Sequence, residues 1–312
     1  MISDYGNKAE EAGVTLCPFA GYDCVPCELG MFLVGKALQS EGDKLGDLAL
    51  NFRGKGGGLP RGTIRTILDA VEGNNQPKRR EGDPRFYPKD YRRTAKNALS
   101  LTKFILPKYQ LGTFTGPNFM SAVNIPVLCR AAPTLGFSSN LAISDKSVVS
   151  GPPSLLNGYG LFPTQIYITT LLVGGMALIF PPFRGWIRNK IKQGYSYNGD
   201  ASGKVYLDVR GISENKKSSA LAKCMFPGDA GIYATGLFAA SVANALLEAT
   251  SSESKDKPLA GFHSPVAAMH CCREGLLVDK LRDLGAEIKV EIILEENGPS
   301  KEIDAAKLQS KL

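Results

Sequence analysis

FAGYDCVPCELG, residues 19–30, joins an apolar run at 14–19 to a longer stretch, 29–38, in which apolar residues recur at helical spacing. A polar segment at 3–12, which ends at Gly13, reads as a short helix in front of the apolar run. Helix, strand, tight turn and helix in this order are typical of α/β proteins. We therefore expect an α/β fold that is organised around this turn.

The turn itself holds residues with three different backbone roles. Gly21 permits a tight turn, Pro26 suits the first turn of a helix, and Asp23 can accept hydrogen bonds from backbone amides as an N-cap. Cys24 and Cys27 have the C-x-x-C spacing of a redox dithiol at a helix N-terminus, where a thiolate is stabilised. The negative charge of Asp23 opposes such a thiolate, and no second ligand pair for zinc follows. A structural role is therefore favoured for both cysteines.

The composition is that of a soluble globular protein with a substantial core. Of the 312 residues, 43% are hydrophobic and 21% are charged. Seven cysteines without a disulfide framework favour a reducing compartment, and the polar first residues do not resemble a secretory signal. His263 and His270 lie seven residues apart without a carboxylate or cysteine at ligand spacing, so no metal is expected.

The net charge of +7 is concentrated in one segment. Residues 78–108 hold ten basic and three acidic residues, whereas the rest of the chain balances. Such a block is typical of a solvated surface segment, with contact to an anionic membrane or a nucleotide phosphate as alternatives. Nucleic acid is not expected as a partner, because the sequence holds no zinc-finger spacing or RNP-type motif. The glycine run at 54–58 lacks a P-loop pattern, so a flexible loop is favoured over a phosphate site there.

Residues 147–183 carry no formal charge, and their centre, 166–180, is almost wholly apolar. As a helix this centre would rise about 22 Å, which is short of the roughly 30 Å hydrocarbon core of a bilayer. A helix at the interface, or inserted into one monolayer, with a basic collar fits this length better than a full span. A buried helix at a domain or dimer interface is the alternative. The residues expected to contact the membrane are Leu171, Leu172, Phe180, Arg184, Arg188, Lys190 and Lys192.

The second half of the chain continues the α/β pattern. Alternating apolar residues predict a strand at 204–210 that pairs as a hairpin with 220–226, and a long helix follows at 233–249. A helix at 266–284 and a strand at 288–294 are expected to close the fold.

Four blocks, in order, resemble the saccharopine dehydrogenase-like oxidoreductases, including the trans-acting enoyl reductase branch. The first runs from Ala12-Gly13-Val14 through FAGYDCVPCELG and is similar to A-G-V, an apolar strand and G-F-D-S-[IV]-P-x-D-L-G. Arg61-Gly62-Thr63 resembles the G-G-T that opens the next helix, and GDAGIYAT at 228–235 resembles G-D-P-G-Y-x-x-T. GFHSP at 261–265 and the segment 277–285 resemble the closing block.

The resemblance implies the remnant of a Rossmann-type parallel sheet and a second α+β domain with a mixed sheet and a hydrophobic helical segment. The nucleotide-binding half of the family, with its G-x-[ST]-G-x-x-[GA] loop, has no counterpart, so we expect this chain to be inactive alone. The expected units are 1–45 (the C-terminal part of a Rossmann-like domain), 46–150 (the first part of the α+β substrate or dimerisation domain, with a basic insertion at 74–108), 151–195 (the hydrophobic segment), 196–295 (the remainder of the α+β domain) and 296–312 (a frayed tail).

By resemblance, the activity is hydride transfer between NAD(P)H and an apolar or lipid-linked substrate. The implied location is a lipid droplet, the endoplasmic reticulum or another cytosol-facing membrane, and a homodimer is allowed. The implied cofactor-binding residues are Gly21, Tyr22, Asp23 and Pro26, and the substrate-binding residues opposite them are Gly62 and Thr63. No catalytic residue is identified, and the capping role is the alternative for Asp23. A non-catalytic interaction protein at a membrane or lipid droplet is the alternative function, and the cytoplasm is the alternative location.

Overall fold

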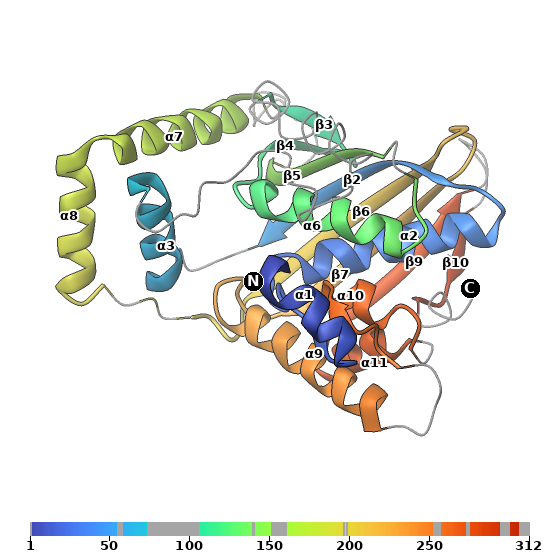
Figure 1. The fold of residues 1–312 in the computed structure, drawn as a ribbon. Helices are drawn as coiled ribbons and strands as arrows, with labels where there is room; N and C mark the ends of the chain where they lie inside the picture. The colour runs from blue at the N-terminus through green and yellow to red at the C-terminus, as the bar shows by residue number, and fades with distance from the viewer. Residues whose placement is uncertain are drawn as a thin grey trace.

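The computed structural model describes residues 2–54, 59–73, 106–138, 141–150, 161–195, 197, 199–251, 257–272, 275–293 and 300–305 (Figure 1). The helices are α1 (Ile2–Glu11), α2 (Val25–Ser40), α3 (Arg61–Glu72), α6 (Ser121–Thr134), α7 (Leu161–Ile179), α8 (Pro181–Lys192), α9 (Tyr233–Ser251), α10 (Pro265–Met269) and α11 (Leu276–Asp283). The strands are β1 (Thr15–Leu16), β2 (Leu45–Gly54), β3 (Lys108–Gln110), β4 (Thr113–Pro117), β5 (Ala142–Ser150), β6 (Lys204–Ser213), β7 (Ser219–Pro227), β8 (Gly261–Phe262), β9 (Glu287–Ile293) and β10 (Ser300–Ile303).

An eight-stranded mixed sheet forms the centre of the molecule, in the order β10-β9-β7-β6-β2-β5-β4-β3. β2 and β5 run parallel, and the other neighbouring strands of this sheet are antiparallel. A small parallel sheet joins β1 to β8, which brings the start of the chain beside residues 261–262. The α/β class with a mixed sheet is therefore confirmed. The hairpin predicted from 204–210 and 220–226 is confirmed as β6 and β7, in which Val209 faces Ala222.

Helix α2 packs across the sheet and is the centre of the hydrophobic core. Residues 25–38 are all buried, as expected for a helix that is apolar on most of its circumference. Two glycines allow its neighbours to approach closely: a Cβ on Gly30 would lie 2.4 Å from a methyl carbon of Val209, and one on Gly35 would lie 2.3 Å from the ring of Phe137. The core of α2 thus depends on the sheet on one side and on α6 on another.

Three helices form an arm that extends from one side of the sheet (Figure 1). The beginning of α7 lies beside β4 and β5, and its other end leads into α8, which turns sharply away. Helix α3 contacts both α7 and α8. We call α3, α7 and α8 together the helical arm.

Two parts of the C-terminal region differ from the expectation. The helix predicted at 266–284 is divided into α10 and α11, and α11 begins after Gly275, whose φ of 69° is left-handed. In the predicted tail, residues 300–303 form β10, which pairs with β9. Four predicted features lie outside the described residues: most of the basic insertion (74–105), the glycines at 56–58, the segment 151–160 and the end of the tail (306–312).

Candidate functional site

The turn before α2 has a different geometry from the one that its glycine suggested. The left-handed residue is Cys24, with φ 100°, and Gly21 does not have a positive φ. Gly21 is needed instead for its small size, because a Cβ there would lie 3.1 Å from the methyl carbon of Thr235 in α9. The predicted N-cap is wrong: Asp23 is exposed, and Cys24 occupies the cap position without a side-chain bond. Pro26 lies in the first helical turn, as predicted.

Tyr22 lies between the sheet and α9. Its ring meets Phe52 of β2 edge-on, with 5.8 Å between ring centroids, and Phe238 of α9 at 6.4 Å. Its hydroxyl makes no hydrogen bond to any of the residues that the structure describes. Burial, with smaller effects of Cys27 and Asp23, raises the pKa of Tyr22 well above its usual value. The hydroxyl is therefore protonated at neutral pH and can donate a hydrogen bond to a ligand.

A chain of buried polar side chains lies beneath the turn and was not foreseen from the sequence. The Cys24 thiol donates to Asn124 Oδ1 (3.7 Å), and Asn124 Nδ2 donates to Asp145 Oδ2 (3.0 Å). Asn118 Nδ2 donates to the other Asp145 oxygen (2.8 Å). Burial raises the pKa of Asp145 to about 6, although these amide donors act in the opposite direction. One signal was present in the sequence: Asn124 lies among the apolar residues of 122–128, and a polar side chain in such a position is buried only with partners.

The two cysteines of the turn have the properties of core residues. Cys24 and Cys27 are fully buried and are not joined in a disulfide. Burial raises the pKa of both thiols, so that neither forms an appreciable thiolate at neutral pH. These properties agree with the structural role that the sequence favoured.

The loop in front of α9 separates the two groups of predicted site residues. Asp229 is buried and accepts hydrogen bonds from the amides of Asp200, Gly231 and Ile232 and from the Tyr197 hydroxyl. On one side of this loop, Gly21 and Tyr22 lie against α9. On the other side, Gly231 lies close to Pro60. A Cβ on Gly231 would be 2.8 Å from the proline ring.

Gly62 and Thr63 follow Pro60 and belong to the helical arm. They begin α3, which packs on α7 and α8. Gly62 is exposed, and a Cβ there would meet nothing within 4 Å. The structure therefore brings Gly21, Tyr22, Asp23 and Pro26 together in one turn and has Gly62 and Thr63 beyond the α9 loop.

The histidines contact backbone carbonyls. A ring nitrogen of His263 lies 3.0 Å from the Ala260 oxygen, and Nδ1 of His270 lies 2.8 Å from the Ala267 oxygen. Within the part of the chain that the structure describes, no group of three or more His, Cys, Asp or Glu side chains lies together as a metal site requires.

Helix α7 has two halves with different surroundings. In the first half, Thr164 and Ile168 are buried, and the Tyr167 hydroxyl donates to the Pro117 carbonyl at the end of β4 (3.0 Å). Beyond Ile168 no residue of α7 is buried: Leu171 is half-buried, and residues 172–176 are all exposed. By length and composition, Phe162–Ile179 is the one helix among the described residues that could cross a membrane.

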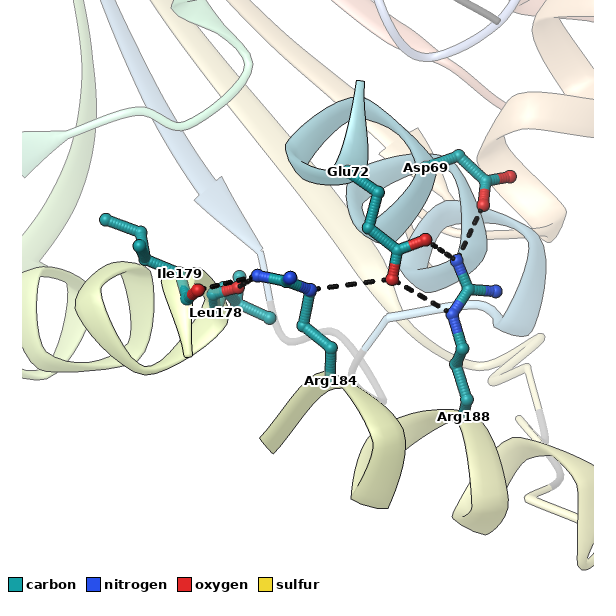
Figure 2. A network of polar contacts seen from close by, with 6 residues as sticks. All are labelled: Asp69, Glu72, Leu178, Ile179, Arg184 and Arg188. Carbon is teal, nitrogen blue, oxygen red and sulfur yellow. Dashed lines mark hydrogen bonds and ion pairs between the residues drawn. The ribbon is translucent and has the colours of Figure 1, made fainter. Parts of the chain in front are cut away.

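The basic residues after α7 divide into two pairs, of which Figure 2 shows the two arginines. Arg188 forms ion pairs with Asp69 (3.0 Å) and Glu72 of α3, and Arg184 Nε lies 3.5 Å from Glu72. The side chains of Lys190 and Lys192 are exposed, and neither makes an ion pair or a hydrogen bond with the part of the chain that the structure describes. Two of the four cations predicted to face lipid phosphates thus have protein partners. We call the group Asp69, Glu72, Arg184 and Arg188 the clasp.

In sequence comparison, no protein-family model matches the chain, and no curated protein matches it either. The family resemblance therefore rests on the four sequence blocks alone.

Proposed function

We propose that this protein attaches to the surface of a lipid layer through the corner between α7 and α8. One observation carries the proposal: α7 is almost wholly apolar, yet only 11% of its 18-residue apolar window is buried. Three large side chains are exposed where α7 ends, with Met176 64% exposed, Ile179 70% and Phe180 62%, and Phe162 at the start of the helix is 70% exposed. Contiguous exposed apolar surface of this kind is typical of a membrane or protein contact.

The packing of α7 favours insertion into one leaflet over a full span. Because Thr164 and Ile168 are buried and Tyr167 is bonded to β4, the first half of α7 belongs to the body of the protein. The free half, 171–180, is about 15 Å long, which is about half the thickness of the hydrocarbon core. Leu171, Leu172 and Phe180 would enter the acyl region, while Lys190 and Lys192 on α8 would meet headgroup phosphates.

A vesicle flotation assay tests the attachment. We expect the chain to float with phosphatidylcholine vesicles that contain an anionic lipid, and less with phosphatidylcholine alone, because each exposed lysine near the surface contributes about 1 kcal/mol. Absence of flotation with both lipid mixtures would contradict the proposal.

For the body of the protein, we propose the substrate side of a saccharopine dehydrogenase-like oxidoreductase. It would transfer hydride between NAD(P)H and an apolar or lipid-linked substrate held at a membrane or lipid droplet. Support comes from Tyr22, which lies in the turn that the resemblance assigns to the cofactor. Its ring packs on Phe52, and its protonated hydroxyl makes no hydrogen bond to the residues that the structure describes. The dinucleotide would supply the hydride chemistry, and Gly21, Tyr22, Asp23 and Pro26 would orient it.

A non-catalytic lipid-surface interaction protein is the second candidate. One observation favours this second candidate: the given sequence contains no G-x-G-x-x-G loop to bind the pyrophosphate of a dinucleotide.

Titration with NADPH separates the two candidates. Saturable binding would support the oxidoreductase, and Tyr22→Phe should then weaken it several-fold, since this change removes one hydroxyl and keeps the ring packing on Phe52. If wild-type protein shows no binding, the interaction protein is the better description of this chain.

A further inference from the structure

The clasp is the point at which all three helices of the arm meet. Arg184 donates from one terminal nitrogen to the carbonyls of Leu178 (2.9 Å) and Ile179 (2.6 Å), at the C-terminal end of α7. Its Nε faces Glu72 of α3, and Arg184 itself belongs to α8. Figure 2 shows this side chain reaching both ways, toward the end of α7 and toward α3. One guanidinium therefore links the carbonyl end of α7 to α3 across the corner.

Further contacts hold α3 antiparallel to α8. Arg188 binds Asp69 and Glu72 in the last turn of α3. At the beginning of α3, the hydroxyl of Tyr195, which follows α8, donates to the carbonyl of Leu59, which precedes α3 (3.0 Å). Leu68 is the one buried residue of α3. Because α3 contributes so little apolar packing, the ion pairs and the Tyr195 bond are the specific contacts that fix α8 against α3.

The orientation of α8 decides where its aromatic residues point. Trp186 lies two residues from each arginine of the clasp, which corresponds to about 200° around a helix. When the arginines face α3, Trp186 therefore faces away from α3, and it is 55% exposed. Its ring stacks on that of Phe183, with 5.5 Å between centroids.

We infer that Asp69 and Glu72 are positioning residues for lipid attachment: by binding Arg184 and Arg188, they hold the α7–α8 corner in the orientation in which Phe180 and Trp186 enter a lipid layer. This inference rests on the proposed attachment. Helix α3 is then part of the lipid-contacting unit, although anionic headgroups would repel the carboxylates of Asp69 and Glu72. The partner is a phospholipid surface, and the two arginines serve the corner geometry while the lysines of α8 remain available for phosphates.

The test uses Trp186, the only tryptophan of the chain, as a fluorescent probe of insertion. Two variants break the clasp from opposite sides: D69N/E72Q raises the net charge by two, and R184Q/R188Q lowers it by two. If only electrostatic attraction mattered, D69N/E72Q would bind anionic vesicles more tightly and R184Q/R188Q less tightly. We expect both variants to lose most of the vesicle-induced blue shift of Trp186, at lipid concentrations that saturate the wild type.

A matched control and two readouts keep the outcomes separate. K216Q/K217Q, in the β6–β7 turn away from the arm (Figure 1), lowers the charge by two outside the clasp and should retain the blue shift. Far-UV circular dichroism verifies that each variant is folded. A wild type without a blue shift or flotation overturns the attachment itself. A wild-type shift that both clasp variants retain, or that changes in opposite directions in the two, overturns the positioning role.

Discussion

Glu28→Ala is expected to lower the free energy of unfolding by about 3–5 kcal/mol, because it leaves several buried donors without an acceptor. Glu28 is fully buried in α2, and its carboxylate accepts from the Ser264 hydroxyl and from the amides of Val266 (3.2 Å) and Ala267 (2.9 Å). These donors belong to the start of α10, whose amides have no acceptor within the helix. Urea unfolding followed by circular dichroism measures the change.

Glu28→Gln separates the loss of the bonds from the loss of the charge. Burial raises the pKa of Glu28 to about 7, so between pH 4.5 and 7 the folded state keeps a proton that the unfolded chain releases. The free energy of unfolding therefore rises as the pH falls through this window, by up to about 1.4 kcal/mol per pH unit. Glutamine at position 28 should remove this contribution to the pH dependence of stability. Asp145, whose pKa is also raised, contributes a pH dependence of the same sign in the wild type and in the Glu28→Gln variant. An alanine variant as stable as the wild type would contradict the role of Glu28.

Glu28 also illustrates which parts of the fold the sequence could predict. The helix that contains it followed from local spacing, as did the β6–β7 hairpin, because each depends on residues close together in the chain. An acidic residue in the first turn of a helix is also favourable for the dipole of that helix. The partners of Glu28, however, are 236 to 239 residues away, at Ser264, which precedes α10, and in the first residues of α10. No local pattern encodes a partner at that separation.

The same limit applies to the arm and to the turn before α2. The uncharged apolar run predicted a helix, at a membrane or buried at an interface, followed by cations. It could not reveal that Glu72 would bind Arg184 and Arg188, over 100 residues later. In the turn, a glycine was the natural candidate for a special backbone conformation. Cys24 has it instead, because its side chain is held in the core while Gly21 makes room for α9.

The combined substitution M176S/I179S/F180S is expected to reduce partitioning onto vesicles by about 100-fold. Burial of a large apolar side chain contributes about 1.5–3 kcal/mol, and three partly inserted ones should together contribute roughly 3 kcal/mol or more. The three side chains are exposed at the end of α7 and make none of the clasp contacts, which use the Ile179 carbonyl and not its side chain. Flotation and Trp186 fluorescence measure the loss.

A matched control replaces three exposed apolar residues elsewhere, as in I232S/L247S/L284S, and should float like the wild type. If both variants float equally well, the corner is not the lipid contact. The sequence also allowed α7 to be a buried helix at a dimer interface, and the corner variant tests this as well. In that case sedimentation would show a wild-type dimer that the corner variant converts to a monomer. Lipid contact instead predicts that wild type and variant sediment alike without lipid, because the corner then has no protein partner to lose.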